Sequence, residues 1–235
     1  GWPDVFVRGG SGDKDYAPGL WLFRNTGDGG FEDVTEASGI LATRGTFDPE
    51  WSRPAHIVVW GDVDNDGYPD AFIAFGTKDS SSADGETPEV VLNNGDGTFR
   101  LGPETGMARR AGLLNSPAGA AFTDYDRDGN LDLWVSHHDF VDESGGMNPV
   151  ADHLYQGDGT GMTIDTSNAT GVVTFPWGDL GKLNAAEGHS WAWSAVACDL
   201  NDDGTPELLA ASYGRAPNLL WQGVRQGDGS VQYLN

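Results

Sequence analysis

Short runs of apolar and β-branched residues alternate with clusters of Gly, Asp and Asn along the whole chain. Between residues 56 and 102 these runs read HIVVWG (56–61), DAFIAF (70–75), EVVLNN (89–94) and TFRLG (98–102). Runs of this length, rich in Val, Ile and Phe and bounded by turn residues, are typical of β-strands. The pattern therefore predicts an all-β chain of many short strands.

A nine-residue acidic pattern interrupts the apolar runs three times. It reads DVDNDGYPD at 62–70, DYDRDGNLD at 124–132 and DLNDDGTPE at 199–207. Carboxylates crowded into one short loop repel one another, and a bound cation relieves that repulsion. One copy would be compatible with a solvated acidic turn. Three copies at matched places between strands argue against that interpretation.

A glycine-rich motif follows each acidic loop at a regular distance. From the first Asp of the loop to the Asp of the GDG triplet is 34 residues in two copies (62 to 96 and 124 to 158) and 29 in the last (199 to 228). We expect each GDG to join the third and fourth strands of a unit through a turn with positive φ. The copies read FRNTGDGGF (23–31), VLNNGDGTF (91–99), LYQGDGTGM (154–162) and VRQGDGSVQ (224–232).

Units of four strands and about sixty residues predict the blades of a β-propeller, and a solenoid of stacked sheets is the alternative. GWPDVFV at 1–7 aligns with GYPDAFI at 67–73, so we expect the chain to begin inside a repeat, with Asp4 at the ninth loop position. Blade faces left open at either end would need further blades or a partner subunit to cover them. The predicted propeller region spans 1–235, with an incomplete blade at about 1–54 and blades at about 55–117, 118–190 and 191–235.

Charge narrows the range of partners. The 235 residues include 13 basic and 36 acidic side chains, a formal net charge of -23. Such a chain is repelled by nucleic acid and by anionic membrane surfaces, and no apolar run is long enough to insert into a bilayer. Cations and neutral or basic ligands remain compatible with this charge. The single cysteine, Cys198, excludes an internal disulfide and is expected to be a small buried residue in the run AWSAVACD.

The acidic loops offer only oxygen ligands, which favours a hard cation over zinc or copper, and their flexible geometry favours calcium over magnesium. We expect three calcium sites, the third weakened by Asn201 and Glu207 in place of Asp. Asp4 would belong to a fourth site that residues preceding Gly1 complete. The predicted ligands are Asp62, Asp64, Asp66, Asp70 and the Tyr68 carbonyl; Asp124, Asp126, Asp128, Asp132 and the Asn130 carbonyl; and Asp199, Asn201, Asp203, Glu207 and the Thr205 carbonyl.

Two phrases carry a resemblance to a known family. VVWGDVDNDGYPDAFI and LFRNTGDGGFEDVTEASGI resemble the FG-GAP or VCBS repeats of integrin-α-like propellers. The second phrase is similar to the group that includes cartilage acidic protein and bacterial proteins with an ASPIC/UnbV domain. The resemblance covers essentially the whole chain. It implies a calcium-stabilised propeller, typically of seven blades, that is secreted, periplasmic or on the cell surface.

The strand order predicts where a ligand would bind. Successive strands of a blade are antiparallel, so acidic loops and GDG hairpins should share one face, and the long irregular loops should share the other. Rigidly held loops commonly carry function, and aromatic rings beside polar groups suit a sugar. We therefore expect a protein- or glycan-binding site on the second face. Its candidate residues are Trp51, Arg53, His137, His138, Asp139, Trp177, His189 and Trp191.

Two functions are compatible with this pattern. The repeats favour a calcium-stabilised adhesion, binding or assembly module without enzymatic activity, as in many proteins of the family that the chain resembles. The alternative is a carbohydrate lyase or dehydratase, which would use His137, His138 or His189 with a carboxylate such as Asp139. Neither a Gly-x-Ser-x-Gly nucleophile motif nor a phosphate-binding glycine loop occurs in the sequence.

Overall fold

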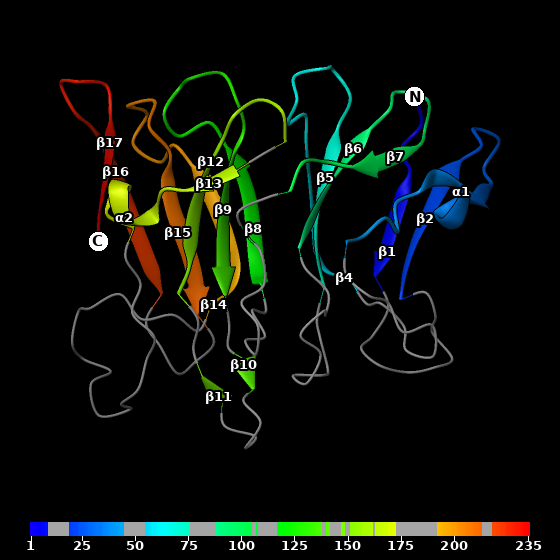
Figure 1. Ribbon diagram of the computed structural model, residues 1–235, viewed down its shortest axis with the longest axis horizontal. Coiled ribbons are helices and arrows are strands. Elements are labelled where there is room, and N and C mark those ends of the chain that lie inside the picture. The colour runs from blue at the N-terminus through cyan, green and yellow to red at the C-terminus, as the bar shows by residue number, and fades with distance from the viewer. Residues whose placement is uncertain are drawn as a thin grey trace.

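The computed structural model shows an all-β chain in which antiparallel sheets stand side by side (Figure 1). Three sheets have four strands and one has three, and a two-stranded ribbon completes the described set. The structure describes residues 1–8, 19–44, 55–75, 88–104, 107, 117–137, 140–141, 147–148, 151–161, 163–172, 192–212 and 218–235.

The second sheet contains the four strands predicted between residues 56 and 102, each within one residue of its expected bounds. They are β4 (Ala55–Gly61), β5 (Asp70–Phe75), β6 (Glu89–Asn93) and β7 (Phe99–Leu101). In the first sheet, β1 (Val5–Arg8), β2 (Leu20–Asn25) and β3 (Phe31–Asp33) correspond to β5, β6 and β7. The repeat seen in the sequence is therefore a repeat of sheets.

The third and fourth sheets follow the same order. The third contains β8 (Pro117–Thr123), β9 (Asp132–His137), β12 (His153–Gly157) and β13 (Thr163–Asp165). The fourth contains β14 (Ala192–Cys198), β15 (Glu207–Ser212), β16 (Leu219–Arg225) and β17 (Val231–Leu234). A two-stranded ribbon pairs β10 (Phe140–Val141) with β11 (Met147–Asn148).

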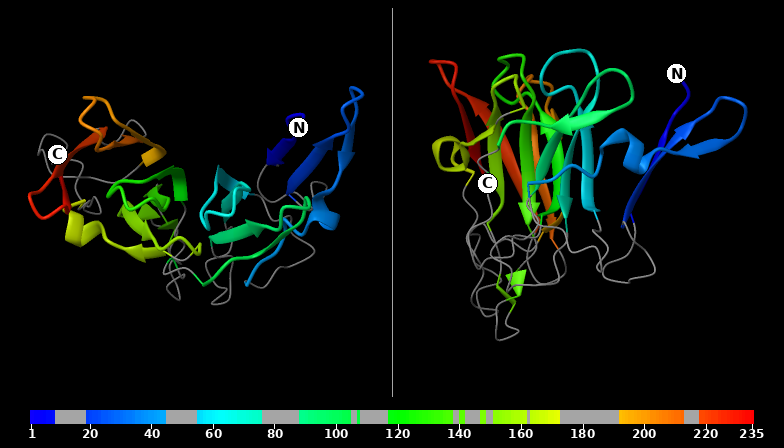
Figure 2. Two further views of the ribbon diagram at one scale, coloured as in Figure 1. Left: turned by 90° about the horizontal axis from the view of Figure 1, so that it is seen from above. Right: turned by 45° about the vertical axis from the view of Figure 1, so that its right-hand side comes forward.

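The four sheets are blades of a β-propeller. They follow one another in space in their sequence order, as the view from above shows (Figure 2). The first strands of the three four-stranded sheets lie innermost, where β4 contacts β8 and β8 contacts β14. A separate apolar core fills each of the three spaces between neighbouring sheets.

The second strand of the second blade, β5, is apolar from Ala71 to Ala74 because both of its faces are covered. In β5, Ala71 and Ile73 pack against the first sheet, whereas Phe72 and Ala74 pack against the third. Successive side chains of a strand point to opposite faces, so a strand between two sheets requires apolar residues at every position. This burial accounts for the run DAFIAF.

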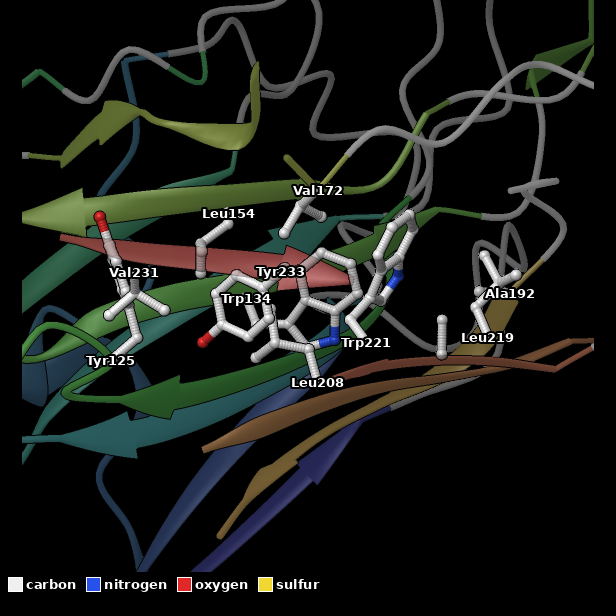
Figure 3. Close-up of a cluster of buried hydrophobic side chains, with 11 residues drawn as sticks. Tyr125, Trp134, Leu154, Val172, Ala192, Leu208, Leu219, Trp221, Val231 and Tyr233 are labelled. Carbon is white, nitrogen blue, oxygen red and sulfur yellow. The ribbon is translucent and has the colours of Figure 1, made fainter. Parts of the chain in front are cut away.

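The largest core lies between the third and fourth sheets. Trp134 of β9 is fully buried there, and its indole nitrogen donates a hydrogen bond of 3.2 Å to the Leu209 carbonyl of β15. Buried indoles usually find such an acceptor. The side chains point toward one another from both sheets (Figure 3). The cluster comprises Tyr125, Trp134, Leu154, Val172, Ala192, Leu208, Ala210, Leu219, Trp221, Val231 and Tyr233.

The innermost strands approach so closely that one position admits only glycine. A Cβ atom built on Gly119 of β8 would lie 2.2 Å from the backbone nitrogen of Ala195 in β14. Gly119 also follows a β-bulge that begins at Pro117, and β4 and β14 begin with the same irregularity. The same bulge therefore occurs near the start of the first strand in each of the three four-stranded blades.

Two short helices, which the sequence patterns did not predict, follow the last strands of the first and third sheets. They are α1 (Thr35–Ser38) and α2 (Ser167–Thr170). Asp33 accepts hydrogen bonds from the amide and hydroxyl of Thr35, and Thr35 Oγ1 accepts one from the Leu22 amide of β2. Asp165 and Ser167 repeat this arrangement. The helices thus tie a blade's outer edge back to its third strand.

Cys198 is exposed, which corrects the expectation that it is buried. Only one face of β14 packs on the core, through residues such as Ala195 and Ala197. On the other face Trp193 and Val196 are 46% and 43% exposed. The run AWSAVACD therefore ends on a strand with one covered face, and an apolar sequence alone did not distinguish the two faces.

Candidate metal centres

Each acidic loop joins the first and second strands of a blade, at the upper end of the sheets in Figure 1. In the loops at 62–70 and 124–132, the seventh residue packs on a left-handed glycine of the hairpin between the third and fourth strands. Tyr68 lies over Gly95, where an added Cβ would be 2.6 Å from the ring, and Asn130 lies in the same way over Gly159. Acidic loops and glycine hairpins therefore share one face, as predicted.

The hairpin of the third blade is shifted by two residues from its expected register. Gly95 and Gly97 have positive φ as predicted, but in the third blade the left-handed residues are Gly159 and Gly161. Strand pairing agrees, because Gly157 is opposite Thr163, as Asn93 is opposite Phe99. LYQGDGTGM contains two overlapping Gly-x-Gly triplets, GDG at 157–159 and GTG at 159–161. The spacing of 34 residues pointed to the first triplet, whereas the left-handed glycines are those of the second.

The first acidic loop is curled by its own carboxylates. Asp62 accepts hydrogen bonds of 2.9 Å from the backbone amides of Asp66 and Gly67. Asn65 and Gly67 adopt left-handed φ values of 59° and 91°, which reverse the chain direction. The side chains at alternate positions consequently turn inward, as the pattern requires for a cation site.

The ninth carboxylate fastens the loop to two strands. Asp70 is fully buried, and its two oxygens accept hydrogen bonds from the backbone amides of Val63 (2.9 Å) and Asn93 (2.7 Å). Asp132 binds the amides of Tyr125 and Gly157 in the same way, at 2.8 and 2.9 Å. These carboxylates are structural staples in addition to being candidate ligands.

The first loop contains a carboxylate oxygen that a cation would satisfy. Asp62, Asp64 and Asp70 each place an oxygen within 4.8 Å of the others. Asp64 Oδ1 is buried without a hydrogen-bond partner among the described residues, while its other oxygen lies 3.7 Å from Arg100. Burial, followed by repulsion from Asp66, raises the pKa of Asp64. The donor set and the unsatisfied oxygen fit a hard divalent cation.

The second loop forms a similar group from Asp124, Asp126 and Asp128. Burial raises the pKa of Asp126, although Gln156 donates a hydrogen bond of 2.5 Å to its Oδ2. Burial also raises the pKa of Asp132 to about 7. Ionised carboxylates are therefore destabilised in this loop, which is the condition that a bound cation would relieve.

The third loop repeats the backbone hydrogen bonds of the first loop, but its inward-facing side chains are arranged differently. Asp199 accepts hydrogen bonds from the amides of Asp203 (3.2 Å) and Gly204 (2.7 Å), and Glu207 accepts one from Leu200 (2.8 Å). Its carboxylates do not converge as those of the other two loops do, among the residues that the structure describes. Hydrogen bonds from Thr205 and Asn201 lower the pKa of Asp203.

Three further carboxylates that were predicted as ligands lie outside the two converging groups. Asp66 lies outside the first group, and Asp132 lies outside the second. Asp4 occupies the ninth position as expected, since its Oδ1 accepts a 2.8 Å hydrogen bond from the Asn25 amide, just as Asp70 binds Asn93. The side chains of Tyr68, Asn130 and Thr205 were not expected to bind, because their carbonyl oxygens were the predicted ligands.

Only one of the eight predicted ligand-face residues lies in the described part of the chain. His137 is the last residue of β9 and is 4% exposed, and its amide donates a 2.8 Å hydrogen bond to Asp152. Burial lowers its pKa to about 3, so the imidazole is neutral. Outside the described residues lie Trp51, Arg53, His138, Asp139, Trp177, His189 and Trp191.

Contacts between acidic loops of neighbouring blades were missed by sequence reasoning. The fourth loop residue makes them from a left-handed conformation. Asn65 donates to Asn130 Oδ1 at 3.0 Å, and Arg127 donates to backbone carbonyls of the loop at 199–207. The fourth position has a different residue in each loop (Asn65, Arg127 and Asp202), so the repeat pattern did not identify it as a contact residue.

The FG-GAP-like repeat matches residues 1–73 and 62–135, which together cover more than half of the chain. The chain belongs to the FG-GAP-like repeat family. Each match extends from one acidic loop to the next, so the family's repeat contains the loop, the strands and the hairpin described above. No curated protein matches the chain. Among the described residues, no helix has the length and apolar character that crossing a membrane requires.

Proposed function

We propose that this FG-GAP-like propeller is a calcium-stabilised module in which the loops at 62–70 and 124–132 each hold one ion. The observation that carries the proposal is Asp64 Oδ1, a buried carboxylate oxygen that accepts no hydrogen bond from the described residues, in a group with Asp62 and Asp70. A bound cation supplies positive charge to these oxygens and offsets their repulsion. The protein's own hydrogen bonds position the loop for that role.

Calcium suits these groups better than other biological cations. Both contain only carboxylates, and neither contains the imidazole or thiolate that zinc and copper prefer. The ligands are mounted on curled loops between strands, a setting that tolerates the irregular coordination of calcium more readily than the strict octahedron of magnesium. The net charge of -23 further favours cation binding over anion binding.

The test is a thermal melt of metal-free chain with chelator, with excess Ca²⁺ and with excess Mg²⁺. We expect Ca²⁺ to raise the melting temperature well beyond the effect of Mg²⁺, because an ion that binds only the folded state stabilises it. Asp64→Ala should reduce this shift. Asp228→Ala, which removes an exposed hairpin carboxylate, is the matched control for net charge and should retain it. A wild-type chain that melts at one temperature in all three solutions would refute calcium binding.

We further propose that the module is exported and binds a protein or glycan partner. Membership of a repeat family of propeller-type binding modules supports this role, as does a scaffold whose three cores hold its blades rigidly. A glycan array and a cell-surface binding assay would distinguish the two partner classes. Trp51→Ala, His138→Ala and Trp177→Ala should abolish binding without lowering the melting temperature, and loss of stability instead would contradict the proposed site.

A further inference from the structure

We infer that the loop at 199–207 is closed by protein donors and binds no calcium, so that this chain binds two ions where its repeat pattern suggests three. The inference rests on the proposed function, since it concerns which FG-GAP-like loops bind the ion. All nine residues of this loop are described by the structure. Three features of the loop support it: the orientation of Asn201, the hydrogen bonds of Glu207 and the position of Arg127.

Asn201 occupies the third loop position, where the other loops have Asp64 and Asp126. Its Oδ1 accepts a 2.9 Å hydrogen bond from the Asp203 amide, just as Asp126 Oδ1 accepts one from the Asp128 amide at 3.1 Å. This bond fixes which end of the Asn201 amide turns inward, because a rotated amide would place two donors against each other. The inward atom is therefore a donor, Nδ2.

Nδ2 of Asn201 lies between the carboxylates that a cation would bridge. It donates to Asp203 Oδ2 at 2.9 Å and to Glu207 Oε1 at 3.2 Å. The equivalent position in the first loop is Asp64, whose buried Oδ1 has no donor in the part of the chain that the structure describes. The NH₂ group of Asn201 thus donates hydrogen bonds to the carboxylate oxygens that a cation would otherwise bind. It also occupies the space through which that cation would approach.

Glu207 and Arg127 add to the closure. The longer side chain of Glu207 keeps the amide contact of the ninth position, to Leu200, and turns its other oxygen toward Asn201. The guanidinium of Arg127 binds the carbonyl oxygens of Asp203 (2.8 Å) and Gly204 (2.7 Å) from the neighbouring blade. These two hydrogen bonds hold the backbone of the third loop in the arrangement in which Asn201 donates to Asp203 and Glu207.

The deciding experiment counts ions by equilibrium dialysis of the metal-free full chain against Ca²⁺, with bound metal measured by mass spectrometry. We expect two ions for the wild-type chain, one for each acidic group. Asp64→Asn copies the third loop's residue into the first and should bind one ion fewer. Asn201→Asp restores the carboxylate and should bind one ion more. Asp202→Asn, an exposed change next to Asn201, is the control and should leave the count unchanged.

Failure of the inference and failure of the proposed function give different results. Three ions in the wild-type chain, or an unchanged count in Asp64→Asn, would overturn the closed loop while leaving calcium binding intact. An unchanged count in Asn201→Asp would overturn the assignment of the closure to the amide. A wild-type chain that binds no ion would refute the proposed function itself. Circular dichroism of each variant shows that a lost ion does not reflect a lost fold.

Discussion

Arg127 of one acidic loop donates a hydrogen bond from Nε to the carbonyl oxygen of Gly204 in the next, at 2.7 Å. One blade earlier, Asn65 donates to Asn130 Oδ1 at 3.0 Å. Both donors occupy the fourth loop position, and both have left-handed backbones, with φ of 62° and 59°. The acidic loops are therefore linked in series across the blades, on the face opposite to the predicted ligand site.

Removing this link should weaken the contact between the third and fourth blades. Arg127→Ala eliminates two charge-assisted hydrogen bonds on a solvent-exposed surface, and we expect a loss of roughly 1 kcal/mol, or about 2–4 °C in melting temperature for a chain of this size. Alanine is preferred to glycine because glycine would also relieve the left-handed backbone. Arg24→Ala, which breaks an exposed ion pair within one blade, should change stability little. Equal losses in both variants would show that Arg127 does not link the blades.

The buried carboxylate at the ninth loop position should contribute to stability without any metal. Asp132→Ala leaves the amides of Tyr125 and Gly157 without their acceptor, and we expect a loss of about 2–4 kcal/mol in urea unfolding with chelator present. Asp4→Ala is the matched control, because Asp4 occupies the same repeat position but accepts one exposed hydrogen bond from the described residues. Its loss should stay below about 1 kcal/mol. Similar losses at both positions would contradict the role of burial.

The close approach of the innermost strands predicts that Gly119 does not accept a side chain. Gly119→Ala would place a methyl group 2.2 Å from the backbone nitrogen of Ala195, and the strands would have to separate. We expect a loss of about 1–3 kcal/mol, the usual cost of overpacking, and more if the neighbouring core opens. Gly227→Ala is the control, since nothing lies within 4 Å of its added Cβ. Near-identical melting temperatures for the two variants would rule out the close approach.

The metal-free chain should become more stable as the pH falls from about 7 toward 4. Burial raises the pKa values of Asp132 and Asp152 from 3.8 to about 7, so the folded state holds protons that the unfolded state has released in this window. His137 opposes the trend, because burial lowers its pKa from 6.5 to about 3. Two carboxyl groups outweigh one imidazole.

Calcium should reverse this pH dependence. Bound cations require deprotonated carboxylates, so acid competes with the ion and the stabilisation by calcium should shrink as the pH falls. Melting temperatures at pH 5.5 and 7.5, with and without Ca²⁺, measure both trends. A metal-free chain that loses stability on acidification from pH 7.5 to 5.5 would contradict the raised pKa values.

The sequence by itself determined the blade and its repeat. Strand bounds in the second blade, the positive φ of Gly95 and Gly97, the shared face of loops and hairpins, and the place of Asp4 all followed from local patterns. These features depend on near neighbours in the chain, through alternating side chains and turn chemistry, so short stretches of sequence contain them.

Only the tertiary structure decided what lies between blades and inside each loop. The register of the third hairpin, the exposure of Cys198 and the contact of Arg127 with Gly204 depend on which segments meet across long sequence distances. The inward donor of Asn201 was not predicted either: the Asp203 amide two residues away donates the hydrogen bond that sets its orientation, but the pattern of residue types does not state which end of the amide turns inward. Asn and Asp have nearly the same shape, so the pattern of the repeat predicts where the third loop lies, and the hydrogen bonds around it determine whether a cation can enter.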